Sequence, residues 1–108
     1  MSCESMITIG RGTTPTYTLT FEEDMEVMQE ILVTFSQDFV IKVEKETEDI
    51  TVDGDTISFR MTQAETLSLS PNVKAYVQVR ALRLDGVVVE CAPFVMNVGV
   101  VLNETVLS

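Results

Sequence analysis

The segment Pro15–Phe21, with the sequence PTYTLTF, alternates polar and apolar side chains along its length. Tyr17, Leu19 and Phe21 fall on one face of an extended chain, and three threonines fall on the other. A period of two residues is typical of a β-strand that is buried on one side, and threonine suits the solvent-facing side of such a strand. The segment therefore predicts a half-buried strand, and the same pattern recurs along the chain.

The recurring pattern predicts further strands over Met6–Ile9, Glu30–Ser36, Phe39–Glu46, Glu48–Val52, Asp55–Met61, Val73–Leu84 and Val87–Val98. Asp-Gly pairs at 53–54 and 85–86 favour hairpin turns, and Gln37-Asp38 is a third hairpin candidate. Pro93 cannot donate a hydrogen bond to a neighbouring strand, so it predicts an edge position or a bulge in the last strand.

Two short helical turns are expected between the strands. Thr62 followed three residues later by Glu65 forms a capping box, which predicts one turn of helix near 62–68. The acidic segment 22–28 connects two predicted strands and is expected to contain the other turn.

The length and the strand pattern together indicate one all-β domain. A chain of 108 residues is the size of a single compact unit, and no linker divides it, so we expect one domain over 1–108. Seven to eight short strands separated by turns indicate an antiparallel β-sandwich. Phe39, Ile41 and Val43 are expected on one face of their strand. The expected core consists of Tyr17, Leu19, Phe21, Val33, Phe35, Ile57, Phe59, Val77 and Val79.

Composition excludes several classes of function. The net charge is −10, whereas a nucleic-acid-binding surface needs basic residues to neutralise phosphate. The chain has no His, the commonest general base and transition-metal ligand. An enzyme is therefore the least expected class, and we predict no catalytic, cofactor-binding or metal-ligating residue. No apolar run approaches the ~20 residues of a membrane span, and the first residues do not resemble a secretory signal peptide, so we expect a cytoplasmic protein.

The cysteines and the acidic turns each have a simple interpretation. Cys3 and Cys91 are expected to be unpaired thiols, as is usual in a reducing compartment. Asp49, Asp53 and Asp55 surround a glycine and suggest calcium, but their spacing differs from the calcium-loop pattern. A solvated turn is the favoured interpretation, and calcium binding is left open.

Two segments suggest contact with another protein. The polar face of Val73–Leu84 carries a mixture of Tyr, Gln and Arg, which is common at interfaces. The segment 95–102 contains no charge and no proline, so as an exposed strand it would be a pairing hazard. We expect its own sheet or another chain to cover it, and we favour a contact between subunits. The predicted interface residues are Tyr76, Gln78, Arg80, Val98, Val100 and Leu102.

Four segments carry a resemblance to a known group of proteins: Arg11–Thr16, Val33–Gln37, Thr62–Leu67, and Val77–Arg80 followed by Asp85-Gly86. Together they resemble small proteins encoded near tail and baseplate genes by phages and prophages of Gram-positive bacteria. They are more loosely similar to the N-terminal domain of phage baseplate upper proteins. The resemblance implies an immunoglobulin-like sandwich and carries no catalytic residues.

The expected function is a non-catalytic structural or protein-interaction module of a phage or prophage tail or baseplate. Its expected partners are other phage structural proteins or a second copy of itself, with no nucleic acid and no membrane. The expected location is the bacterial cytoplasm during assembly and then the virion. Two alternatives remain: a β-sandwich that binds a small ligand or carbohydrate, and an acidic inhibitor protein.

Overall fold

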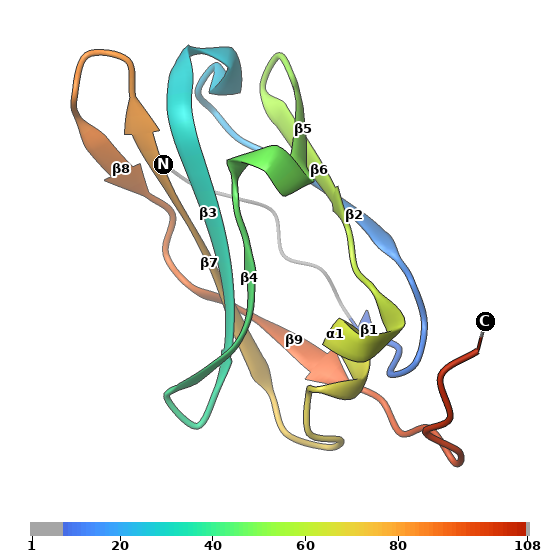
Figure 1. Cartoon of the computed structure of the whole chain (residues 1–108). Coiled ribbons are helices and arrows are strands. Elements are labelled where there is room, and N and C mark those ends of the chain that lie inside the picture. Colours follow the sequence, from blue (N-terminus) through green and yellow to red (C-terminus); the bar gives the residue numbers. More distant parts are fainter. Residues whose placement is uncertain (1–7, 108) are drawn as a thin grey trace.

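The computed structural model describes residues 8–107, which form a two-layered sandwich of strands (Figure 1). The secondary structure confirms the all-β prediction. Three short helical segments connect the strands: η1 (Met25–Val27), η2 (Thr47–Asp49) and α1 (Gln63–Leu67). The strands are β1 (Thr8–Ile9), β2 (Thr16–Thr20), β3 (Met28–Gln37), β4 (Val40–Lys45), β5 (Ile50–Asp53), β6 (Thr56–Arg60), β7 (Ala75–Arg83), β8 (Val88–Glu90) and β9 (Phe94–Val98).

The larger sheet has the order β1-β9-β7-β3-β4, with β8 also paired to β7, and the smaller sheet has the order β2-β6-β5. The strands pair as antiparallel neighbours, as predicted, except that the two-residue strand β1 pairs with β9 in parallel. The order β9-β7-β3-β4 opposite β2-β6-β5 corresponds to strands G-F-C-C′ opposite B-E-D of immunoglobulin-like sandwiches.

The core lies between the two sheets. All nine predicted core residues are buried, together with further residues such as Met25, Met61 and Leu69. Phe59 on β6 meets Phe35 of the opposite sheet and Tyr17 of its own sheet in edge-to-face contacts, with ring centroids 6.1 Å and 6.0 Å apart. These geometries are the ones that aromatic quadrupoles favour.

The predicted last strand is interrupted at residues 91–93, which explains why nine strands are present where seven to eight were expected. β8 pairs with Arg80–Leu82 of β7, and β9 pairs with Ala75–Val77. Between them the Cys91 amide donates to the Val79 carbonyl at 3.0 Å, and the Val79 amide donates to the Cys91 Sγ at 3.3 Å. Pro93 is the last residue of this break, which fits the interruption that a proline predicts in the last strand. Cys3 lies outside the described residues, so the state of the two cysteines stays a prediction.

The helix α1 begins as the capping box predicts. The Thr62 side chain accepts from the Glu65 amide, and the Glu65 carboxylate accepts from the Thr62 amide, at 3.1 Å and 2.8 Å. Glu65 also pairs with the buried ammonium of Lys45 on β4. The helix lies at one end of the sandwich (Figure 1), and its Glu65 side chain links it to β4 of the larger sheet.

The β3–β4 hairpin differs from its prediction in a way that affects the surface. The turn residues are Asp38 and Phe39, one position later than expected, and the register shifts between Phe35 and Ser36. A one-residue change of register moves side chains to the opposite face of a strand. Phe39, Ile41 and Val43 were expected on one face of their strand, and this is wrong: Val43 is buried, whereas Phe39 and Ile41 are exposed.

The buried and exposed phenylalanines give a direct test of this fold. Phe59→Ala is expected to lower the free energy of unfolding by about 3–5 kcal/mol, because it removes a ring from the centre of the core. Phe39→Ala removes the same ring from an exposed turn and is expected to change stability by less than about 0.5 kcal/mol. Urea denaturation of the two variants measures the difference, and equal effects would contradict the described register.

Candidate functional site

The outward side of the larger sheet carries a row of exposed apolar side chains. In register, Val95 of β9 lies beside Tyr76 of β7, Tyr76 beside Ser36 of β3, and Ser36 beside Ile41 of β4. The exposed fractions are 38% for Val95, 48% for Tyr76 and 59% for Ile41. We call Val95, Tyr76, Ser36 and Ile41 the apolar row. Because the row crosses four hydrogen-bonded strands, the backbone positions that carry its side chains are fixed relative to one another.

A hollow of about 620 Å³ lies along this row. Thr34 and Ser36 contribute small side chains from β3, and Tyr76 and Gln78 stand on the adjacent strand β7. Gln78 is fixed because its Nε2 donates to the Cys91 carbonyl at 3.1 Å. The complete lining is Thr34, Ser36, Asp38, Phe39, Tyr76, Gln78, Arg80 and Pro93. The hollow therefore combines two exposed aromatic rings with several polar groups.

Phe39 has an unusual backbone conformation for its position. Asp38 and Phe39 both have positive φ, at 49° and 63°, in the two-residue turn between β3 and β4. Such turns favour Asn-Gly, and a bulky residue in this region is strained. The Phe39 ring is also fully exposed, so burial does not offset the strain. Strained residues of this kind occur more often at functional sites, and here one stands at the edge of the hollow.

The strain predicts that a smaller residue at the turn will stabilise the protein. Phe39→Gly is expected to raise the free energy of unfolding by about 0.5–1 kcal/mol, because glycine has no Cβ to clash at positive φ. Phe39→Ala is the matched control, since it also removes the ring but keeps the Cβ. Urea denaturation should rank Gly above Ala; the reverse order would show that the turn is unstrained.

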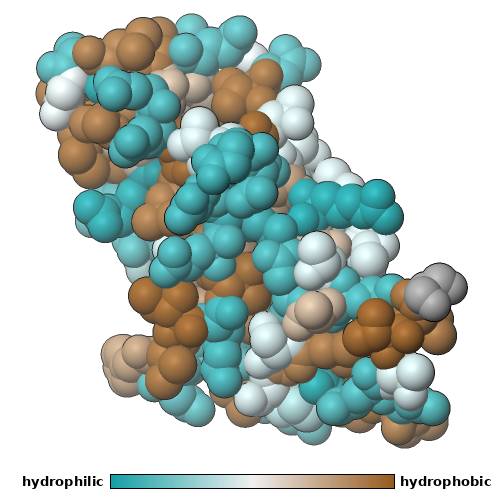
Figure 2. All heavy atoms as spheres, in the orientation of Figure 1, coloured by the Kyte–Doolittle hydropathy of each residue, from teal (hydrophilic) through white to brown (hydrophobic). Residues whose placement is uncertain are grey.

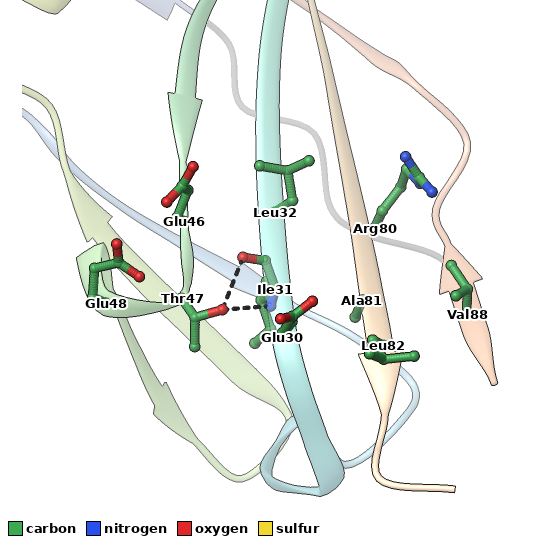
Figure 3. Close-up of a pocket in the computed structure, with 10 residues that line it drawn as sticks. All are labelled: Glu30, Ile31, Leu32, Glu46, Thr47, Glu48, Arg80, Ala81, Leu82 and Val88. Carbon is green, nitrogen blue, oxygen red and sulfur yellow. Dashed lines mark hydrogen bonds between the residues drawn. The ribbon is translucent and has the colours of Figure 1, made fainter. Parts of the chain in front are cut away.

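Arg80 also lines a second hollow of about 440 Å³ on the same sheet. Figure 3 shows the residues of this second hollow. The second hollow has Glu30, Glu46 and Glu48 around it, and we call these three residues the acidic cluster. In its wall the Thr47 hydroxyl accepts from the Ile31 amide at 2.9 Å and lies 3.4 Å from the Ile31 carbonyl oxygen. These bonds tie η2 to β3 and hold the acidic cluster near the sheet.

One member of the acidic cluster, Glu46, has a shifted pKa. The pKa of Glu46 is raised, chiefly by the charge of Glu48 and a hydrogen bond to it, with smaller contributions from burial and from the charges of Glu44 and Asp49. Like charges disfavour the ionised form of a carboxyl group. This end of the sheet can therefore attract cationic groups.

Neutralising one member tests this account. Glu48→Gln is expected to lower the pKa of Glu46, because it removes the largest source of repulsion. Glu44→Gln is the matched control and is expected to lower the pKa less. A carbon-detected NMR titration of the side-chain carboxyl groups measures both, and an unchanged pKa in Glu48→Gln would contradict the described arrangement.

The structure brings together only part of the predicted interface. Tyr76, Gln78 and Arg80 all line the first hollow. Val98 was a wrong choice, because its side chain points into the core with 5% exposure. Val100 and Leu102 are exposed, but they follow β9 and do not line the hollow. The backbone of residues 94–98 is paired with β7 and β1 of the same sheet, so, contrary to our favoured prediction, this strand needs no second chain to protect its edges.

Two side chains, those of Arg11 and Gln63, hold the residues that follow β9 to the rest of the chain. Arg11 is buried and donates from Nε to the Leu69 carbonyl at 2.7 Å, and from one terminal nitrogen to the Leu67 carbonyl at 3.0 Å and to Glu104 at 2.8 Å. Gln63 forms a reciprocal pair with the Leu107 backbone at 2.6 Å and 2.8 Å. Sequence reasoning missed Arg11, because its partners lie at least 56 residues away along the chain and leave no local signal.

The three aspartates considered for calcium accept hydrogen bonds from their own chain. The backbone carbonyls of Asp53 and Asp55 accept from the Thr56 hydroxyl and the Phe21 amide. Asp49 accepts from the Glu46 amide at 3.2 Å and so caps η2. Within residues 8–107, no group of three or more His, Cys, Asp or Glu side chains is arranged to hold a metal ion.

Comparisons with known proteins add no relative. No family model matches the chain, and no curated protein matches it. Within the described part of the chain, no helix is long and apolar enough to cross a membrane.

Proposed function

We propose that this chain is a non-catalytic structural module that acts by protein–protein contact through the outward side of its larger sheet. The observation that carries the proposal is the apolar row with its hollow, which places Tyr76, Ile41 and Val95 on the surface of a strongly acidic domain. Exposed apolar residues that form a continuous patch mark interaction sites more often than isolated ones do.

The chemistry of the patch suits a protein partner. Tyr and Arg are the residue types that dominate binding energy at protein interfaces, and Tyr76 and Arg80 both line the hollow. Among the described residues, the Arg80 side chain makes no hydrogen bond or ion pair, so its guanidinium is available to a partner's carboxylate. The strand pairing fixes the backbone of both residues, so no backbone order has to be gained on binding.

We further propose that the module belongs to a phage or prophage tail or baseplate, with other phage structural proteins as partners. This step rests on the sequence resemblance carried by segments such as Thr62–Leu67. It places the protein in the bacterial cytoplasm during assembly and then in the virion.

Incorporation into particles tests the proposal. After prophage induction in the native host, density-gradient fractions containing intact particles are analysed by mass spectrometry for this chain. The wild-type chain is expected in those fractions, and Tyr76→Ala is expected to be depleted from them at least tenfold. Thr51→Ala, at an exposed strand position of the smaller sheet, is the control and should behave as wild type. Absence of the wild-type chain from the particles would reject the phage assignment.

A carbohydrate-binding module is the second candidate, and one observation favours it. Phe39 and Tyr76 are both exposed at the hollow, and exposed rings beside hydrogen-bonding groups are the usual elements of a sugar site. An NMR titration with representative mono- and disaccharides distinguishes the two functions. Saturable shifts of the Phe39 and Tyr76 amides would favour carbohydrate binding over protein contact. The acidic-inhibitor alternative has less support, because only the acidic cluster gathers carboxylates around a hollow.

A further inference from the structure

The geometry of the apolar row points to a specific partner: we infer that the outward sides of two copies of this chain pack against each other as a two-fold dimer. The inference deepens the proposed function and rests on it, since it names the partner of the same surface. It follows from the order of side chains across four adjacent strands.

The row is self-complementary. Reading across the sheet, its members are Val95, Tyr76, Ser36 and Ile41, on β9, β7, β3 and β4. A large ring stands beside a small hydroxyl at the centre, and one aliphatic side chain stands at each end. A two-fold axis that lies between β7 and β3 and runs along the strands exchanges the two halves of this row. Residue i of one copy then meets residue j of the other, as an isologous interface requires.

The central pair provides a knob and a hole. In the two-fold arrangement, Tyr76 of each copy lies over Ser36 of the other. The small side chains of Thr34 and Ser36 line the hollow at this place, so it can receive the ring. At the ends of the row, Ile41 of one copy lies over Val95 of the other. Two sheets that pack face to face interdigitate their side chains in this way, at a small angle set by their twist.

The polar groups near the row also find partners in the dimer. Gln78 lies beside Thr34 in register, so the same axis places Gln78 of one copy near Thr34 of the other. Arg80 lies beside Leu32, and the axis therefore places the aliphatic stem of Arg80 over Leu32 of the second copy. The dimer thus leaves the Arg80 guanidinium at the margin, where solvent reaches it.

Charge and size set the expected strength. No member of the apolar row is charged, but Glu44 lies beside Thr34 in the next row, and each chain has a net charge of −10, so two copies repel each other. Salt screens such repulsion, and the dimer should therefore strengthen as salt rises. Four strands ~4.8 Å apart and about seven residues long offer a flat area of roughly 400 Å². Stable interfaces bury ~800 Å² per partner, about twice this area, so we expect a weak and reversible dimer.

Sedimentation velocity on the full chain from 1 to 500 µM tests the inference. The wild type is expected to shift from monomer to dimer across this range, and the shift should begin at lower concentration in 300 mM than in 30 mM NaCl. Ser36→Arg fills the hole and is expected to weaken association at least tenfold. Thr51→Arg adds the same side chain at an exposed strand position of the smaller sheet, and it is expected to associate as wild type.

Tyr76→Ala removes the knob and serves as the second variant if Ser36→Arg fails to fold, because the Tyr76 side chain is exposed. A wild-type chain that stays monomeric at 500 µM would overturn the dimer, and so would a dimer that both variants leave intact. Either result leaves the proposed function standing, since incorporation into particles is measured separately and depends on other proteins.

Discussion

The edge-to-face contact between Phe35 and Phe59 is the interaction on which the rest of the sandwich depends, because it joins the two sheets at their centre. Immunoglobulin domains of antibodies use a disulfide and a tryptophan at this place, whereas this chain contains no tryptophan. Here aromatic rings supply the contact between layers, and Tyr17 extends it along the smaller sheet. The Tyr17 hydroxyl is buried without a hydrogen-bond partner in the described residues, and its burial raises the pKa of the phenol. The core therefore tolerates one unsatisfied group in order to hold a large ring.

The fixed core determines what the outward side presents. Because side chains alternate along β3 and β7, burial of Phe35 and Val77 forces Ser36 and Tyr76 outward beside each other. The register shift after Phe35 then turns Ile41 outward into the same row. The surface proposed for partner contact therefore follows from the register of β3 and β7 and from the register shift in the β3–β4 hairpin.

Sequence reasoning predicted the sandwich well because alternation reports burial directly. Segments such as Pro15–Phe21 have one apolar and one polar face, and only one register buries the apolar one. The capping box at Thr62 was equally readable, since both of its hydrogen bonds are local. The β3–β4 hairpin was misread for a physical reason: Phe39 looks like the start of a buried strand, and nothing local indicates that it occupies a strained turn. The hollow could not be predicted, because it depends on which strands become neighbours.

Two backbone carbonyl groups and one carboxylate surround the Arg11 side chain, and this has a consequence for how the protein is made. The partners of this buried side chain come from positions 67, 69 and 104, and the last of these is 93 residues away. During synthesis on the ribosome, the complete set of Arg11 contacts can therefore form only after Glu104 has been added, when nearly the whole chain is present.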